Sequence, residues 1–73
     1  MTRKLTAIIE PEDHRFVSLC PEFDIASQGN TVAEARANLA EAVELFLETA
    51  SQEEIKRRYK GEVLISPLEV SVG

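Results

Sequence analysis

The sequence predicts a small α+β domain in which three strands, two helices and a last strand follow one another. Residues 4–28 contain short stretches where apolar and polar side chains alternate, separated by turn-forming residues. Residues 31–50 carry apolar side chains at helical spacing, and residues 62–72 are again rich in aliphatic side chains. The 73 residues suffice for one domain, so we expect a single domain over residues 1–73.

The first two strands are predicted to form an antiparallel hairpin. In residues 4–10, Leu5 alternates in direction with its polar neighbours, as in a strand. Pro11 and Asp13 then mark a turn, because proline presets φ and aspartate hydrogen-bonds locally. Residues 14–20 form the second strand, and the short connection makes the pair antiparallel.

A third, shorter strand is predicted over residues 23–28. Pro21 ends the preceding strand because it cannot donate a hydrogen bond to a sheet. Gly29 and Asn30 turn the chain after residue 28, since both residue types tolerate a positive φ.

A long helix is predicted to begin at Thr31. Thr31 and Glu34 have the spacing of a capping box, in which the threonine oxygen accepts from the Glu34 amide and Glu34 reaches back. At ~100° per residue, one stripe of this helix is apolar. Its members are Val32, Ala35, Leu39, Ala42, Val43, Phe46, Leu47 and Ala50.

A second capping box at residues 51–54 predicts a short helix through Tyr59, with Gly61 as its C-terminal stop. Residues 62–72 are predicted as the last strand, which Pro67 places at an edge or a bulge. One long helix covers only one face of a sheet. Apolar side chains such as Val17 and Leu19 therefore imply an uncovered apolar face, and we expect a homodimer or higher oligomer to cover it.

The composition and net charge of the chain argue against several classes of function. The net charge of −5 argues against nucleic-acid binding, because Lys and Arg supply most of that affinity. One cysteine and one histidine exclude an intramolecular disulfide and a His/Cys zinc cluster. No apolar run approaches the ~20 residues that span a bilayer, and the N-terminus does not read as a signal peptide. We therefore expect a cytoplasmic protein with no membrane association, metal or cofactor.

The spacing of the candidate residues argues against two kinds of catalytic site. Metal-dependent cleavage needs several converging carboxylates, but Glu10, Glu62 and Glu69 lie only at or near the ends of the predicted strands. Cys20 and His14 would lie six positions apart on one strand, about 20 Å, where a nucleophile and its base need about 3 Å. We predict that the protein has no catalytic residues and is not an enzyme.

An ordered set of motifs resembles the HicB family of antitoxins. Those motifs are Phe16-Val17-Ser18-Leu19-Cys20-Pro21-Glu22-Phe23, Ser27-Gln28-Gly29-Asn30-Thr31, Glu34-Ala35, Asn38-Leu39, Glu41-Ala42 and Leu45-Phe46-Leu47-Glu48. The family pattern has a strand ending in Cys-Pro-Glu, a Ser-Gln-Gly-Asp-Thr turn, and a helix with Glu-Ala, Asn-Leu and Glu-Ala pairs. The sequence departs from this pattern at Asn30, where aspartate is usual, and at Asp24, where glycine is common.

This resemblance implies a partial ribonuclease-H-like fold: a βββα(α)β two-layer arrangement with a mixed four-stranded sheet, strand order 3-2-1-4, and one main helix on one face. It also implies a partner, a small basic RNA-cleaving toxin of the HicA type, whose active site the antitoxin would block. Many family members carry a C-terminal DNA-binding module. Only a strand is predicted after the helices here, so direct DNA binding is not expected of this chain.

The polar face of the long helix is the candidate partner-binding surface. Its members, with Phe23 from the preceding loop, are Glu34, Asn38, Glu41, Glu44, Leu45, Glu48 and Phe23. An ordinary solvated face, and a core position for Phe23, remain open alternatives. The functional alternative is an orphan oligomeric domain, structural or ligand-binding, that has this fold and no toxin partner.

Overall fold

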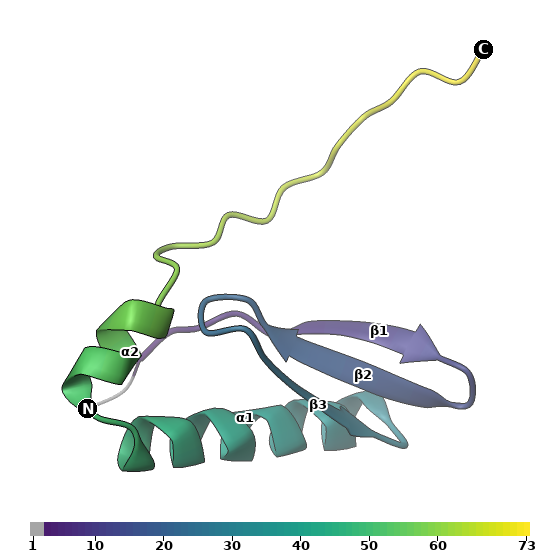
Figure 1. The fold of residues 1–73 in the computed structure, drawn as a ribbon. Helices are drawn as coiled ribbons and strands as arrows, with labels where there is room; N and C mark the ends of the chain where they lie inside the picture. Colours follow the sequence, from purple (N-terminus) through teal and green to yellow (C-terminus); the bar gives the residue numbers. More distant parts are fainter. Residues whose placement is uncertain (1–2) are drawn as a thin grey trace.

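The computed structural model describes residues 3–73 and has a sheet layer above a helix layer (Figure 1). The elements follow in the order β1 (Ile8–Glu12), β2 (Arg15–Cys20), β3 (Ile25–Gly29), α1 (Val32–Thr49) and α2 (Gln52–Arg58). The predicted α+β class and the antiparallel hairpin of the first two strands are confirmed. Neither helix of the described residues combines the length and apolarity needed to cross a membrane.

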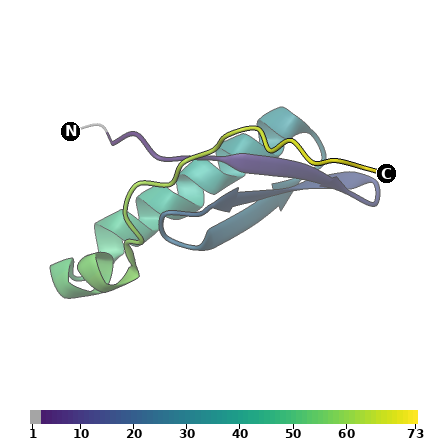
Figure 2. The same ribbon diagram turned by 90° about the horizontal axis from the view of Figure 1, so that it is seen from above.

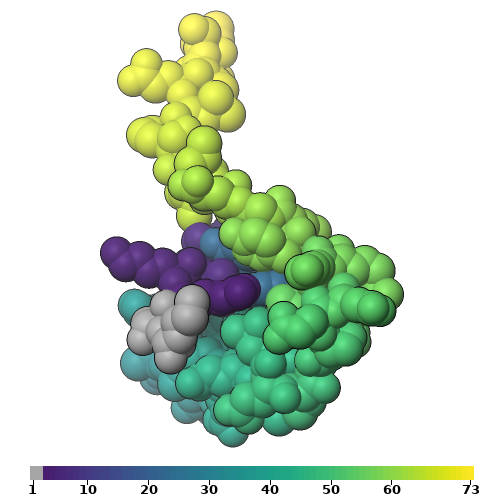
Figure 3. Space-filling view, turned by 90° about the vertical axis from the view of Figure 1, so that its left-hand side faces the viewer, coloured from purple at the N-terminus to yellow at the C-terminus, as the bar shows by residue number. Residues whose placement is uncertain are grey.

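The predicted four-stranded sheet is wrong. Within residues 3–73 the sheet has three strands in the order β1-β2-β3, and both pairings are antiparallel. Residues 62–73, which we call the tail, form no strand and run away from the sheet and helices (Figures 1 and 3). Two features account for this course. Gly61 turns the chain with φ +88°, and Pro67 removes a hydrogen-bond donor in the middle of the segment.

The first strand begins later than predicted and passes through the proline. Pro11 lies inside β1, opposite Phe16, and the turn consists of Asp13 and His14. Because β1 is at the edge of the sheet, a residue without an N–H group is tolerated there. Asp13 adopts φ +55°, a left-handed conformation that aspartate accepts better than most residues.

Gly29 ends β3 where the strand comes closest to α1. A Cβ atom on Gly29 would lie 2.5 Å from the Ala35 amide nitrogen, so no other residue fits without a shift of backbone. The buried Ser18 hydroxyl donates to the Ala35 carbonyl at 2.9 Å. These contacts set the distance between sheet and helix at the first turns of α1.

Both predicted N-caps are confirmed. The Thr31 hydroxyl accepts from the Glu34 amide at 3.0 Å, and the Ser51 hydroxyl accepts from the Glu54 amide at 3.1 Å. The Glu34 carboxylate reaches back to the amide of Asn30, one residue before the cap, at 3.1 Å. The helix starts are therefore determined by local sequence.

The core lies between the end of β2, the loop after it, α1 from Leu39 onward, and α2. Its buried members are Cys20, Phe23, Leu39, Val43 and Ile55, with Leu5, Ile25, Phe46, Leu47 and Ala50 packed against them. The strands lie over only part of α1 (Figure 2), and α1 packs mainly on β3 and β2.

The sheet face opposite α1 carries a half-buried apolar row. The register pairs Ile8 with Leu19, and Val17 shares their face because it lies two residues before Leu19 on β2. Acidic Glu10, paired with Val17, interrupts this row on β1. The apolar surface expected on the uncovered face is therefore present but small.

Candidate protein-binding surface

The polar side of α1 is an acidic face directed away from the sheet. Ala35, Leu39 and Val43 are the buried residues of the helix, so the side chains opposite them face solvent. Helical spacing puts six of the predicted residues on this solvent side: Glu34, Asn38, Glu41, Glu44, Leu45 and Glu48. We call these six residues the acidic face. It includes Leu45, an aliphatic side chain that is 59% exposed and lies beside Glu41 and Glu48 at helical spacing.

Two members of the acidic face have structural contacts. The carboxylate of Glu34 accepts from the Asn30 amide, and the Asn38 side-chain amide donates to the Gln28 carbonyl at 2.8 Å. Both contacts hold the turn between β3 and α1. The side chains that remain exposed beyond this turn are Glu41, Glu44, Leu45 and Glu48.

Phe23 does not belong to this surface. It is 0% exposed and packs between the rings of Phe46 and Tyr59, at centroid distances of 5.5 and 5.4 Å. The guanidinium of Arg58 lies 4.8 Å from the centroid of the Phe46 ring and donates to the Phe23 carbonyl at 2.8 Å. The interpretation of Phe23 as a partner contact is corrected to a core role, because α2 folds over the loop that contains it.

Sequence reasoning missed a buried carboxylate. Glu22 lies in the loop after β2, and its two oxygens accept from the amide and the hydroxyl of Thr6, at 3.0 and 2.6 Å. Burial raises the pKa of this carboxyl, but the hydrogen bonds that it accepts, foremost those from Thr6, together outweigh burial and hold the pKa below its ordinary value. Nothing local in the sequence marks the pairing, because the partners come from different segments.

The thiol of Cys20 belongs to the same cluster. It is buried and donates to Glu22 Oε1 at 3.5 Å. Burial raises the pKa of the thiol, and the hydrogen bond to Glu22 adds to the rise. Cys20 ends β2, whereas His14 is exposed in the turn before it. The thiol is therefore held protonated and is not placed beside the histidine.

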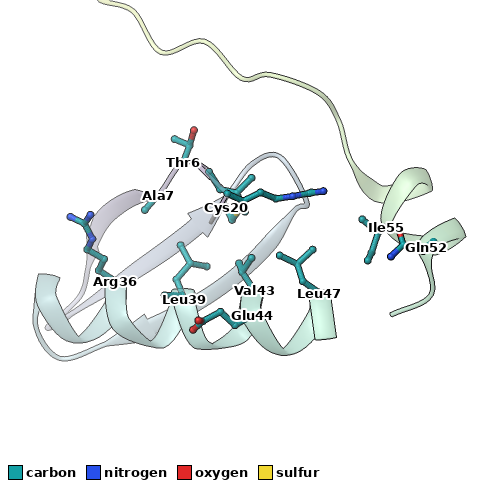
Figure 4. A pocket seen from close by; sticks show the side chains of 13 residues that line it. Thr6, Ala7, Cys20, Arg36, Leu39, Val43, Glu44, Leu47, Gln52 and Ile55 are labelled. Atoms are coloured by element: carbon teal, nitrogen blue, oxygen red, sulfur yellow. The ribbon is translucent and has the colours of Figure 1, made fainter. Parts of the chain in front are cut away.

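A groove of about 600 Å³ opens between residues 3–7 and α1 (Figure 4). Leu39, Val43 and Leu47 point into it from the helix, and Ile55 closes one end from α2. Arg3 and Arg36 contribute basic groups to its lining. Glu44 also contributes to the lining, but its carboxylate points away from the sheet in Figure 4. The groove exists because the strands leave this side of α1 uncovered.

The described acidic, histidine and cysteine side chains form no cluster of metal ligands. Among residues 3–73, no three His, Cys, Asp or Glu side chains come close enough to share a metal ion. The acids of α1 lie along a helix face rather than converging on a point. The surface presents a negative strip that includes one exposed leucine, a chemistry suited to a cationic protein surface.

Comparison with known proteins gives one informative relative. The chain is 48% identical over 50 residues to a UPF0150 protein of Synechocystis sp.; the match covers 66% of this chain and 69% of the relative. No family model matches the chain, and no solved structure matches it.

Proposed function

The chain belongs to the UPF0150 family, and from this premise we propose that it is a non-catalytic, antitoxin-like protein that binds and occludes a small basic RNA-cleaving toxin of the HicA type. The resemblance of residues 16–48 to HicB antitoxins supports the choice of partner. The complex would form in the cytoplasm. The observation that carries the proposal is the acidic face, in which Leu45 is exposed among the glutamates.

The charge of the acidic face suits such a partner. α1 has four glutamates and a single basic residue, Arg36, which lies on the groove side. Like charges at neighbouring helix positions cost an isolated helix a few tenths of a kcal/mol. A cationic surface would remove that repulsion and gain from charge complementarity, mainly in the rate of association.

The thiol and the buried carboxylate support a non-catalytic role. A nucleophilic cysteine needs a lowered pKa, whereas the pKa of Cys20 is raised. The Glu22 carboxylate already accepts hydrogen bonds from Thr6 and Cys20. It therefore holds the loop in place and is not free to act as a general acid or base.

The test uses the toxin itself. A short basic reading frame with a single histidine, expected beside this gene, supplies the probe; its product should co-purify with the chain and lose RNA cleavage in the complex. Reversing two charges with Glu41→Lys and Glu44→Lys should slow association about tenfold or more at low salt. The matched control, Glu12→Lys with Glu53→Lys, has the same net charge and exposed sites elsewhere.

Equal association rates for the two double variants would move the interface away from α1. No co-purification with that product, or no such reading frame, would favour the alternative of an oligomeric domain without a toxin partner. The groove beside α1 supports that alternative, because a ligand or a second copy of the chain could bind in it.

A further inference from the structure

We propose that the tail of one molecule docks into the groove between residues 3–7 and α1 of a second molecule, so that two copies exchange tails. The contact joins two chains; within one chain the sheet has three strands. The proposal does not depend on the toxin partner. It gives a role to the tail and to the groove, neither of which belongs to the acidic face.

The tail is apolar and exposed. Five large aliphatic side chains stand in solvent between 66% and 92% exposed: Leu64, Ile65, Leu68, Val70 and Val72. After Pro67, apolar residues alternate with Glu69 and Ser71, so an extended tail has one apolar side. An exposed apolar side of this length is typical of an interaction site.

The groove has the complementary surface. Its floor is aliphatic, from Leu39, Val43 and Leu47, and Arg3 and Arg36 add positive charge. The only charged side chains of the tail are the acids Glu62 and Glu69. A tail that lays its apolar side on the floor therefore also gains from opposite charge.

The course of the chain directs the tail outward. The Lys60 amide donates to the Glu22 carbonyl at 2.8 Å, and Gly61 with φ +88° then turns the backbone. Figure 3 shows the yellow, C-terminal part of the tail standing clear of the body. Eleven residues from Glu62 to Val72 reach about 35 Å when extended, which exceeds the two shorter dimensions of the molecule, 28 and 19 Å.

The area is adequate for a dimer. Two exchanged tails would remove on the order of 1,000 Å² of apolar surface from water, counting five aliphatic side chains each. Specific interfaces begin at about this size. Exchange is reciprocal, so the contact closes as a two-fold dimer and leaves no free tail.

The experiment is sedimentation of the full chain over a wide concentration range, with hydrogen exchange of the tail amides at both ends of that range. We expect a dimer at micromolar concentration, and tail protection that rises with protein concentration. A monomer with exposed tail amides overturns the proposal, and so does a monomer whose tail is protected at every concentration.

Matched variants locate the contact. Val70→Asp places a charge on the apolar side, and Ala40→Glu places one in the groove; each should weaken the dimer about tenfold or more. Ser71→Asp and Ala37→Glu add the same charges at exposed positions outside the contact and should leave it unchanged. Circular dichroism confirms that each variant is folded.

Equal dimerisation of all four variants overturns the proposal. A tail that becomes protected only on adding a different protein also overturns it and assigns the tail to that protein. Glu41→Lys should lose toxin binding and still form the dimer. That result would show that toxin binding and tail exchange use different surfaces.

Discussion

Thr6 donates two hydrogen bonds to the carboxylate of Glu22, although sixteen residues separate them in the chain. The amide bond is 3.0 Å long and the hydroxyl bond 2.6 Å. The pair fastens the segment before β1 to the loop after β2. The pair also lies beside the groove, because Thr6 contributes to the groove lining.

Glu22 makes folding stability depend on pH in the acid range. Its pKa is lower in the folded state, so its contribution is present above the unfolded pKa and disappears as the pH falls through the folded pKa. We expect the free energy of unfolding, measured by urea denaturation, to fall between about pH 5 and pH 3.

Glu22→Gln should lower the free energy of unfolding at pH 7 by about 1–3 kcal/mol, because the amide cannot accept all three hydrogen bonds. The variant should also lose stability less steeply with acid than the parent. Glu53→Gln, at an exposed position, is the control and should keep the parent's slope. Parallel slopes for the parent and Glu22→Gln would contradict this role.

Arg58 should stabilise the fold more than its neighbours in α2. It donates to the Phe23 carbonyl at 2.8 Å and covers the Phe46 ring, whereas Arg57 is exposed. Arg58→Ala should cost about 1–3 kcal/mol in denaturant unfolding, since a part-buried carbonyl loses its donor and a ring loses its cover. Arg57→Ala should cost less than about 0.5 kcal/mol. Equal losses of unfolding free energy in the two variants would mean that the contacts of Arg58 with Phe23 and Phe46 do not stabilise the fold.

Gly29 should be intolerant of any side chain. Its Cβ would meet the backbone of Glu34 and Ala35 at 2.8 and 2.5 Å, and backbone cannot rotate aside as a side chain can. Gly29→Ala should destabilise the fold by about 1–3 kcal/mol, or more if the helix start shifts. The control is Gly73→Ala, whose Cβ would meet nothing within 4 Å and whose φ lies outside the left-handed region, so it should leave the free energy of unfolding unchanged. A stable Gly29→Ala would show that α1 can move away from β3.

Local signals account for the elements that were predicted well. The two helix starts follow from Thr31 and Ser51, whose capping contacts lie within three residues. The acidic face follows from the same periodicity that places Leu39 and Val43 in the core. Such features depend on spacing alone, so one sequence determines them.

Long-range contacts account for the errors. Residues 62–72 have the composition of a strand, but a strand needs a neighbour, and the pattern does not say whether one is available. The sequence predicts a turn at Pro11, whereas its place inside a strand is tolerated only because β1 lies at the edge of the sheet. Phe23 and Glu22 were misjudged or missed because their partners, Arg58 and Thr6, come from distant segments.

Cys20 should react slowly with thiol reagents in the folded protein. The sulfur is buried, and its raised pKa keeps it protonated at pH 8. Labelling with a disulfide reagent should therefore be at least about a hundredfold slower than in urea, because it requires opening of the fold. Ala37→Cys supplies an internal control, since the added thiol is exposed on α1 and should react in a separate fast phase. If both thiols react in the fast phase, the loop around Glu22 opens freely and the Thr6 contact does not hold it. If Glu22→Gln alone accelerates the slow phase, the carboxylate is the group that closes this part of the core.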